Sequence, residues 1–270
     1  MISSSVINKL ANMTITHNLG VPDSGALDTD HLEQQLAQAR TLGVKARPVI
    51  VGPLTCLWRG TAGGDSKRLD LLPQLLAVYA ELLARLRAQD VEWVQVDEPA
   101  LATELDATWH AACVTAYEAL AGSGVKLLLT ICCGPLKNNL ALACGLPVDG
   151  LHLDAINARG EIEPAIEALG PDKVLSLGVI DGGSVWKTDL HATLAWLEPV
   201  QRRIGERLWI APSCPLLHLA PDLADAEALA LAQQKLDELR ILARALDEGR
   251  SRVQFELVAN AAAIDGRVAA

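Results

Sequence analysis

Short apolar runs alternate with longer amphipathic stretches along most of the chain. The runs are rich in valine, leucine and isoleucine, which is typical of strands buried in a parallel sheet. They predict strands at Arg47–Val51, Trp93–Glu98, Val125–Cys132, Gly150–Ile156, Val174–Ile180 and Arg207–Pro212, with Met13–Thr16 as a weaker seventh.

The amphipathic stretches place apolar residues at helical spacing. They predict helices ending near Thr41 and at Lys67–Arg87, Ala107–Ala121, Lys137–Cys144, Ile162–Leu169, Leu190–Ile204 and Leu223–Leu246. Strands that alternate with helices in this way indicate a parallel sheet with crossover helices. No GxGxxG motif follows the first strand, so a dinucleotide-binding fold has no support.

No linker interrupts these units, so we expect one domain over residues 1–270. The natural closed arrangement is a (β/α)8 TIM-barrel-like fold, which needs eight strands. Because the chain supplies six clear strands and one weak one, we expect an α/β barrel that is incomplete or modified at its N-terminal end.

The stretch Val91–Leu101 combines a strand with two carboxylates. Proline cannot continue a central strand, so the strand is expected to end at Glu98, just before Pro99. Asp97 and Glu98 then lie at the carboxyl end of a buried parallel strand, where α/β proteins bind ligands. The alternative is that Asp97 caps the following helix and Glu98 faces solvent.

Other predicted strands also end in polar or thiol side chains. These are Thr55 and Cys56, Thr130, Cys132 and Cys133, His152 and Asp154, Asp181, and Ser213 and Cys214. Thiolate, imidazole and carboxylate groups are zinc ligands, and a thiol is also a nucleophile. The spacing of these residues does not distinguish a zinc site or a nucleophile from ordinary packing. Free cysteine often packs as a small apolar residue, and a buried histidine is often only hydrogen-bonded.

Composition narrows the class of partner. The net charge of −10 and the pI of about 5.1 argue against nucleic acid and anionic membranes. No uncharged apolar run is long enough to span a bilayer, and the N-terminus has no signal-peptide pattern. We therefore expect a cytoplasmic protein whose six cysteines are reduced thiols.

Several ordered stretches together resemble cobalamin-independent methionine synthase, specifically its N-terminal barrel. They are residues 48–58, 93–101, 125–130, 146–156, 173–190 and 207–218. The resemblance implies a family of two related (β/α)8 barrels. The C-terminal barrel of that family binds zinc and homocysteine and transfers a methyl group from 5-methyltetrahydrofolate polyglutamate. Zinc lowers the pKa of a thiol, so homocysteine is held there as the nucleophilic thiolate.

The resemblance also implies candidate site residues. The zinc-ligand positions of the catalytic barrel correspond here to Thr130, Cys132, Asp154 and Cys214. Three of these could bind zinc, and His152 or Cys133 could supply a fourth ligand in place of Thr130. By the same resemblance Asp97 binds the substrate ammonium group, with Glu98 and Ser213 as further substrate-binding candidates.

The function implied by resemblance is methyl transfer from 5-methyltetrahydrofolate to the homocysteine thiol. The sequence lacks the family's second barrel and its opening segment, and both absences weaken the expectation of activity by this chain alone. The alternative is a non-catalytic barrel that binds a small ligand, or that pairs with a separate catalytic barrel or with a second copy of itself.

Overall fold

The computed structural model describes residues 14–17, 30–60, 68–132, 134–216 and 225–268. It divides into two compact units. The N-terminal unit comprises Ala11–His152 and Gly160–Lys173, and the C-terminal unit includes Leu153–Arg159 and Val174–Ala270. The prediction of a single domain stays a prediction, and each unit is described by itself below.

The N-terminal unit contains parallel strands whose spatial order follows the chain. The register pairs Val51 with Asp97 and Asp97 with Thr130, so the ends of three neighbouring strands are level. The strands are β1 (Thr14–His17), β2 (Arg47–Val51), β3 (Trp93–Asp97), β4 (Lys126–Ile131) and β5 (Gly150–Leu153).

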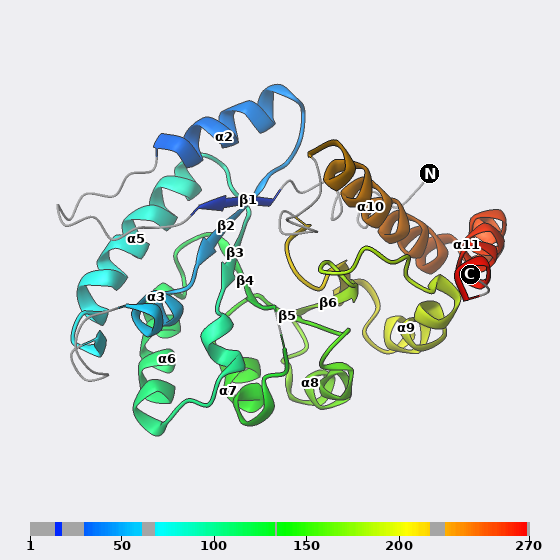
Figure 1. Ribbon diagram of the computed structural model, residues 1–270. Helices are drawn as coiled ribbons and strands as arrows, with labels where there is room; N and C mark the ends of the chain where they lie inside the picture. Colours follow the sequence, from blue (N-terminus) through cyan, green and yellow to red (C-terminus); the bar gives the residue numbers. More distant parts are fainter. Residues whose placement is uncertain (1–13, 18–29, 61–67, 133, 217–224, 269–270) are drawn as a thin grey trace. The chain divides into compact units, whose positions relative to one another are not determined.

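Helices cover one side of these strands (Figure 1). They are α2 (Asp30–Thr41), α3 (Pro53–Arg59), α5 (Leu72–Ala88), α6 (Ala107–Leu120), α7 (Leu140–Gly145) and α8 (Ile162–Ala168), with the short 3-10 helices η1 (Pro99–Ala102), η2 (Lys137–Asn139) and η3 (Arg159–Glu161). We call the sheet face turned away from α3, α5 and α6 the inner face.

Local sequence explains where these helices begin. The Asp106 side chain accepts hydrogen bonds from the backbone N–H groups of Thr108 and Trp109, which caps α6. The helix predicted from Lys67 begins later, at Leu72, as α5. Pro73 lies in its first turn, where the missing N–H of proline costs no helical hydrogen bond.

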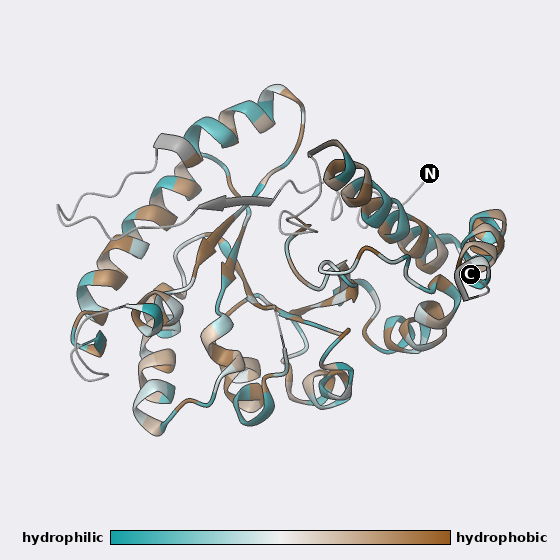
Figure 2. Ribbon diagram, viewed as in Figure 1, coloured by the Kyte–Doolittle hydropathy of each residue, from teal (hydrophilic) through white to brown (hydrophobic). Residues whose placement is uncertain are grey.

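Alternation along β3 sends side chains to both faces of the sheet. Val94 and Val96 are fully buried, whereas Trp93, Gln95 and Asp97 are partly exposed. The valines form part of the apolar core, and Figure 2 shows hydrophobic colour on the neighbouring strand β2. The inner face of β3 therefore carries the polar residues of this strand.

In its described residues, the C-terminal unit contains two parallel strands and three long helices. They are β6 (Val174–Ile180), α9 (Leu190–Ile204), η4 (Gly205–Arg207), β7 (Leu208–Pro212), α10 (Asp225–Glu248), η6 (Arg250–Val253) and α11 (Gln254–Val268). Helix α9 begins where predicted because the Asp189 carboxylate caps it through the Ala192 N–H.

The structure corrects three elements predicted from sequence. The strand predicted over Gly150–Ile156 ends at Leu153, since Asp154 binds the backbone of its own turn. Pro53–Arg59 forms helix α3 where no helix was predicted. After the helix predicted at Leu223–Leu246 we expected a polar or short helical tail, but Gln254–Val268 forms a full helix, α11.

The α/β class is confirmed, with seven parallel strands in the described part of the chain, one fewer than a complete (β/α)8 barrel requires. The cysteines at 56, 113 and 144 are free thiols. Among the described helices, none is long and apolar enough to cross a membrane.

Candidate functional site

Asp97 lies on the inner face of the N-terminal unit, at the carboxyl end of β3. Its Oδ1 accepts a hydrogen bond from Gln95 Nε2 at 2.8 Å, and the two residues share a face because they are two apart on the strand. Burial raises the pKa of Asp97 to about 6, although the Gln95 bond and the Arg47 charge both lower it. The structure therefore holds this carboxylate in a fixed orientation without fully neutralising it.

Arg47 supplies positive charge to the same face. It begins β2, two residues before Val49, which pairs with Gln95 in the register. Burial lowers the pKa of Arg47 to about 10, and the charge of Asp97 opposes that shift. Even so, the guanidinium stays protonated at neutral pH.

His152, on β5, is the third titratable group near Arg47. Its side chain is buried, and burial followed by the Arg47 charge lowers its pKa to about 3. The imidazole is therefore neutral at physiological pH. We call Arg47, Gln95, Asp97 and His152 the inner-face cluster.

The inner-face cluster contains groups of opposite charge on one sheet face. Asp97 and Arg47 interact electrostatically, and both are partly exposed. A carboxylate and a guanidinium held in this way can bind the ammonium and the carboxylate of one zwitterion. A neutral imidazole beside them can accept or donate a hydrogen bond without adding charge.

Glu98 does not join the cluster, although it follows Asp97 in the chain. Its side chain is completely buried and accepts bonds from Leu54 N at 3.0 Å and Thr55 N at 2.8 Å. The hydroxyls of Thr55 and Tyr117 donate at 2.6 and 3.2 Å. Burial raises the pKa of Glu98 to about 7 against these four bonds. Glu98 thus faces α3 and α6, and its predicted contact with substrate remains a prediction.

Ser213 lies in the C-terminal unit, directly after β7. Its side chain is buried, and its Oγ accepts a hydrogen bond from Gly182 N at 3.2 Å. Its backbone N–H donates to Ile180 at 2.8 Å. Ser213 therefore joins the ends of β6 and β7, and its predicted role in substrate binding also remains a prediction.

The predicted zinc ligands are divided between the units. Cys132 is buried directly after β4 in the N-terminal unit, while Asp154 and Cys214 belong to the C-terminal unit. Cys133 lies outside the described residues. Within the described ranges, no three His, Cys, Asp or Glu side chains form a group that could hold a metal ion.

The local chemistry of Asp154 does not fit a zinc ligand. Its Oδ1 accepts from Ile156 N at 3.0 Å and from Asn157 N at 3.1 Å, and its Oδ2 accepts from Asn157 Nδ2 at 2.7 Å. Both oxygens therefore stabilise the turn after β5. Thr130, at the position of the family's histidine, donates its hydroxyl to Leu128 O at 3.4 Å.

Two members of the inner-face cluster, Arg47 and Gln95, were not predicted from sequence as site residues. The available signal was their position: each is a polar residue within a run predicted to be a buried strand. Their grouping depends on the pairing of β2 with β3, which strand-end positions alone do not give.

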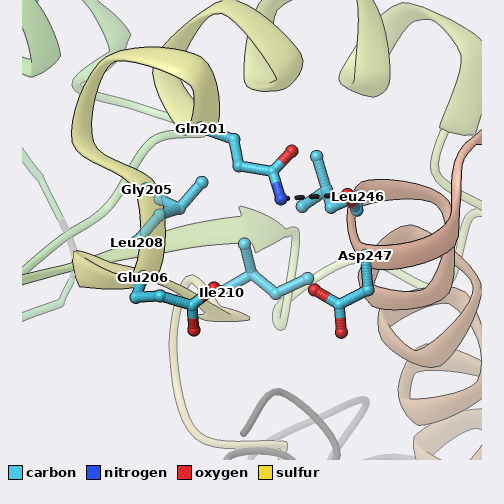
Figure 3. A pocket seen from close by; sticks show the side chains of 7 residues that line it. All are labelled: Gln201, Gly205, Glu206, Leu208, Ile210, Leu246 and Asp247. Atoms are coloured by element: carbon cyan, nitrogen blue, oxygen red, sulfur yellow. Dashed lines mark hydrogen bonds between the residues drawn. The ribbon is translucent and has the colours of Figure 1, made fainter. Parts of the chain in front are cut away.

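A small hollow lies within the C-terminal unit. It is lined by Gln201, Gly205, Glu206, Leu208, Ile210, Leu246 and Asp247 (Figure 3). The Gln201 amide donates to the Leu246 carbonyl at 3.0 Å. Because Leu208 begins β7, this hollow lies at the opposite end of that strand from Ser213 and Cys214.

Comparisons with known proteins agree with this fold. A B12-independent methionine synthase from a Shewanella species, in complex with selenomethionine, is 17% identical with a TM-score of 0.61, over 84% of this chain and 67% of that chain. A Listeria monocytogenes protein assigned as a vitamin-B12-independent methionine synthase is 18% identical with a TM-score of 0.59, over 81% and 69%.

A D-psicose 3-epimerase from Clostridium cellulolyticum, with D-tagatose, is 14% identical with a TM-score of 0.53, over 89% of this chain and 91% of that chain. At such low identities, these three likenesses establish the fold alone.

The family itself is established by sequence. The model for the N-terminal domain of cobalamin-independent synthase matches residues 20–205. Because that match covers more than half of the chain, the protein belongs to the family of the N-terminal domain of cobalamin-independent methionine synthase.

Proposed function

We propose that the protein serves methyl transfer from 5-methyltetrahydrofolate to the homocysteine thiol, and that its part is to bind the amino acid. The observation that carries the proposal is the presence of opposite charges, on Asp97 and Arg47, that share the inner face and interact electrostatically. Both side chains are only partly exposed, and a zwitterionic ligand would give each of the two charges a partner.

Homocysteine suits this pair chemically. Its ammonium group meets the Asp97 carboxylate, which the Gln95 amide holds in place, and its carboxylate meets the planar guanidinium of Arg47. The neutral His152 adds a polar group without a competing charge. The binding groups all come from the N-terminal unit.

A separate catalytic barrel activates the homocysteine thiol. Cys132, Asp154 and Cys214 remain the zinc ligands implied by resemblance, but the oxygens of Asp154 serve its own turn, so no step is assigned to zinc here. The folate donor and the zinc then belong to the partner barrel. Pairing with that barrel, rather than with a second copy, is the assembly we propose.

Ligand binding tests whether this protein binds the amino acid. Isothermal titration calorimetry with L-homocysteine is expected to show binding by the wild type and a loss of about tenfold or more in Asp97→Asn, since a charge-assisted bond is lost. Glu92→Gln is the matched control, because Glu92 pairs with Lys126 at 3.1 Å on the exposed surface. No binding by the wild type at millimolar ligand, or equal binding by Asp97→Asn, would overturn the proposal.

Metal analysis and an activity assay test whether thiol activation belongs to a separate barrel. Purified protein is expected to contain zinc well below one ion per chain and to form no methionine alone. Zinc near one ion per chain, together with methionine formation, would contradict this. Loss of both in Cys132→Ser would then establish the zinc site implied by resemblance.

A further inference from the structure

Two turns of the N-terminal unit that are distant in sequence are bound to each other. One follows β2 and is the first turn of α3, from its N-cap Gly52 to Thr55, and the other follows β3 and contains Glu98. The Thr55 hydroxyl donates to Glu98 Oε2 at 2.6 Å, and the Thr55 N–H donates to the same oxygen at 2.8 Å. Leu54 N donates to Oε1 at 3.0 Å, so both carboxylate oxygens hold the first turn.

The backbone around Asp97 is held by the same arrangement. The Asp97 carbonyl accepts from Gly52 N at 2.8 Å, and Glu98 N donates to Thr130 O at 2.9 Å. A Cβ at position 52 would overlap the Glu98 side chain, so the contact requires glycine. The Thr55 hydroxyl also accepts from Ala100 N at 3.2 Å and thereby bridges Glu98 and the start of η1.

We infer that Glu98 is a positioning residue: by holding the Gly52–Thr55 turn it fixes the backbone of Asp97, and so the direction of the Asp97 carboxylate in the inner-face cluster. This inference rests on the proposed function, because it deepens the role of the same site. In this role Glu98 acts through Asp97.

A carboxylate is the group that this position needs. Four donors converge on Glu98, from two N–H groups and two hydroxyls. Above its pKa of about 7, the ionised Glu98 carboxylate accepts at both oxygens, whereas an amide presents one acceptor and one donor. In Glu98→Gln, the amide NH2 therefore replaces one carboxylate oxygen and faces N–H or O–H donors. Only one atom of the side chain then accepts hydrogen bonds from the start of α3.

The test compares two variants of Thr55 in the full chain. Thr55→Val removes the hydroxyl at almost the same volume, and Thr55→Ser keeps it. Thr103→Val is the matched control, since the Thr103 hydroxyl donates to Ala100 O beside the same turn without reaching Glu98. Circular dichroism establishes folding, and Glu98→Gln is added where it folds.

Two readouts are measured well below the melting temperature. The first is the midpoint of the Asp97 carboxyl titration by carbon NMR, for which Arg47 and His152 are the neighbouring charged or titratable groups. The second is the Kd for L-homocysteine. Thr55→Val is expected to move the midpoint by about half a pH unit or more and to raise Kd about fivefold to tenfold. Thr55→Ser and Thr103→Val are expected to match the wild type.

A role in stability alone would lower the melting temperature and leave both readouts unchanged. Folded Thr55→Val with a wild-type midpoint and a wild-type Kd would therefore overturn the inference. If the wild type binds no homocysteine, the proposed function fails, and the Asp97 midpoint still decides whether Glu98 positions that carboxylate.

Discussion

The carboxylates of Asp97 and Glu98 lie on opposite faces of the sheet, although the residues are neighbours in the chain. Asp97 binds Gln95 on the inner face, whereas Glu98 binds Thr55 of α3 and Tyr117 of α6. Strand alternation produces this division, because successive side chains point to opposite sides. One Asp-Glu pair thus supplies a charge to the candidate ligand site and an anchor to the helical layer.

The pH dependence of stability tests the burial of Glu98. Its folded pKa of about 7 exceeds the ordinary 4.5, so the stabilisation it contributes is full below pH 4.5 and is lost as pH rises through 7. Wild type should therefore lose about 3 kcal/mol relative to Glu98→Gln between pH 4.5 and pH 8. Urea unfolding of both proteins across this range measures the difference, and parallel curves would contradict it.

His152 contributes a pH dependence of stability in the opposite direction to that of Glu98. Its folded pKa of about 3 lies below the ordinary 6.5, so its stabilisation is present above pH 6.5 and is lost as pH falls toward 3. His152→Gln is expected to lose less stability than the wild type between pH 6.5 and pH 4. Equal acid sensitivity of His152→Gln and the wild type would show that His152 is charged when folded.

Many of the strands and helices can be predicted from the sequence because local residues determine where they begin and end. The strands Arg47–Val51 and Val174–Ile180 and the helix Leu190–Ile204 have the predicted bounds. Each depends on a short apolar run or on a capping residue such as Asp189. Helix α3 was missed because Gly52-Pro53 marks a turn as readily as a helix start.

The site is less predictable because its contacts cross the chain. Asp97 was placed correctly at a strand end, since proline at 99 limits the strand. The partner of Glu98 is Thr55, 43 residues earlier, and no sequence periodicity connects the two. The hydrogen bonding of Asp154 within its own turn is local by contrast, since the Asn157 amide three residues later donates to its Oδ2, but no apolar pattern in the sequence indicates it.

Lys235 tests how α10 holds the loop after β6. Its side chain is completely buried, and its ammonium donates to the Trp186 carbonyl with Glu238 as the nearby negative charge. Lys235→Met should lower the free energy of unfolding by about 2–4 kcal/mol, because it leaves the carbonyl without this donor and Glu238 without this cation. Lys187→Met, at an exposed position of the same loop, should change it by less than about 0.5 kcal/mol. A Lys235→Met protein at least as stable as the wild type would show that apolar packing replaces the ion.

The pH dependence of ligand binding tests the role of Asp97. Its pKa of about 6 means that the carboxylate is increasingly protonated below pH 6 and cannot then pair with an ammonium group. The affinity for L-homocysteine should therefore rise as pH increases from 5 to 7, by up to about tenfold for each pH unit below the pKa. The thiol and amino group of the ligand stay protonated over this range, so the change belongs to the protein. In Asp97→Asn the remaining affinity should not vary with pH, and a variant that kept the wild-type profile would assign the titration to another group.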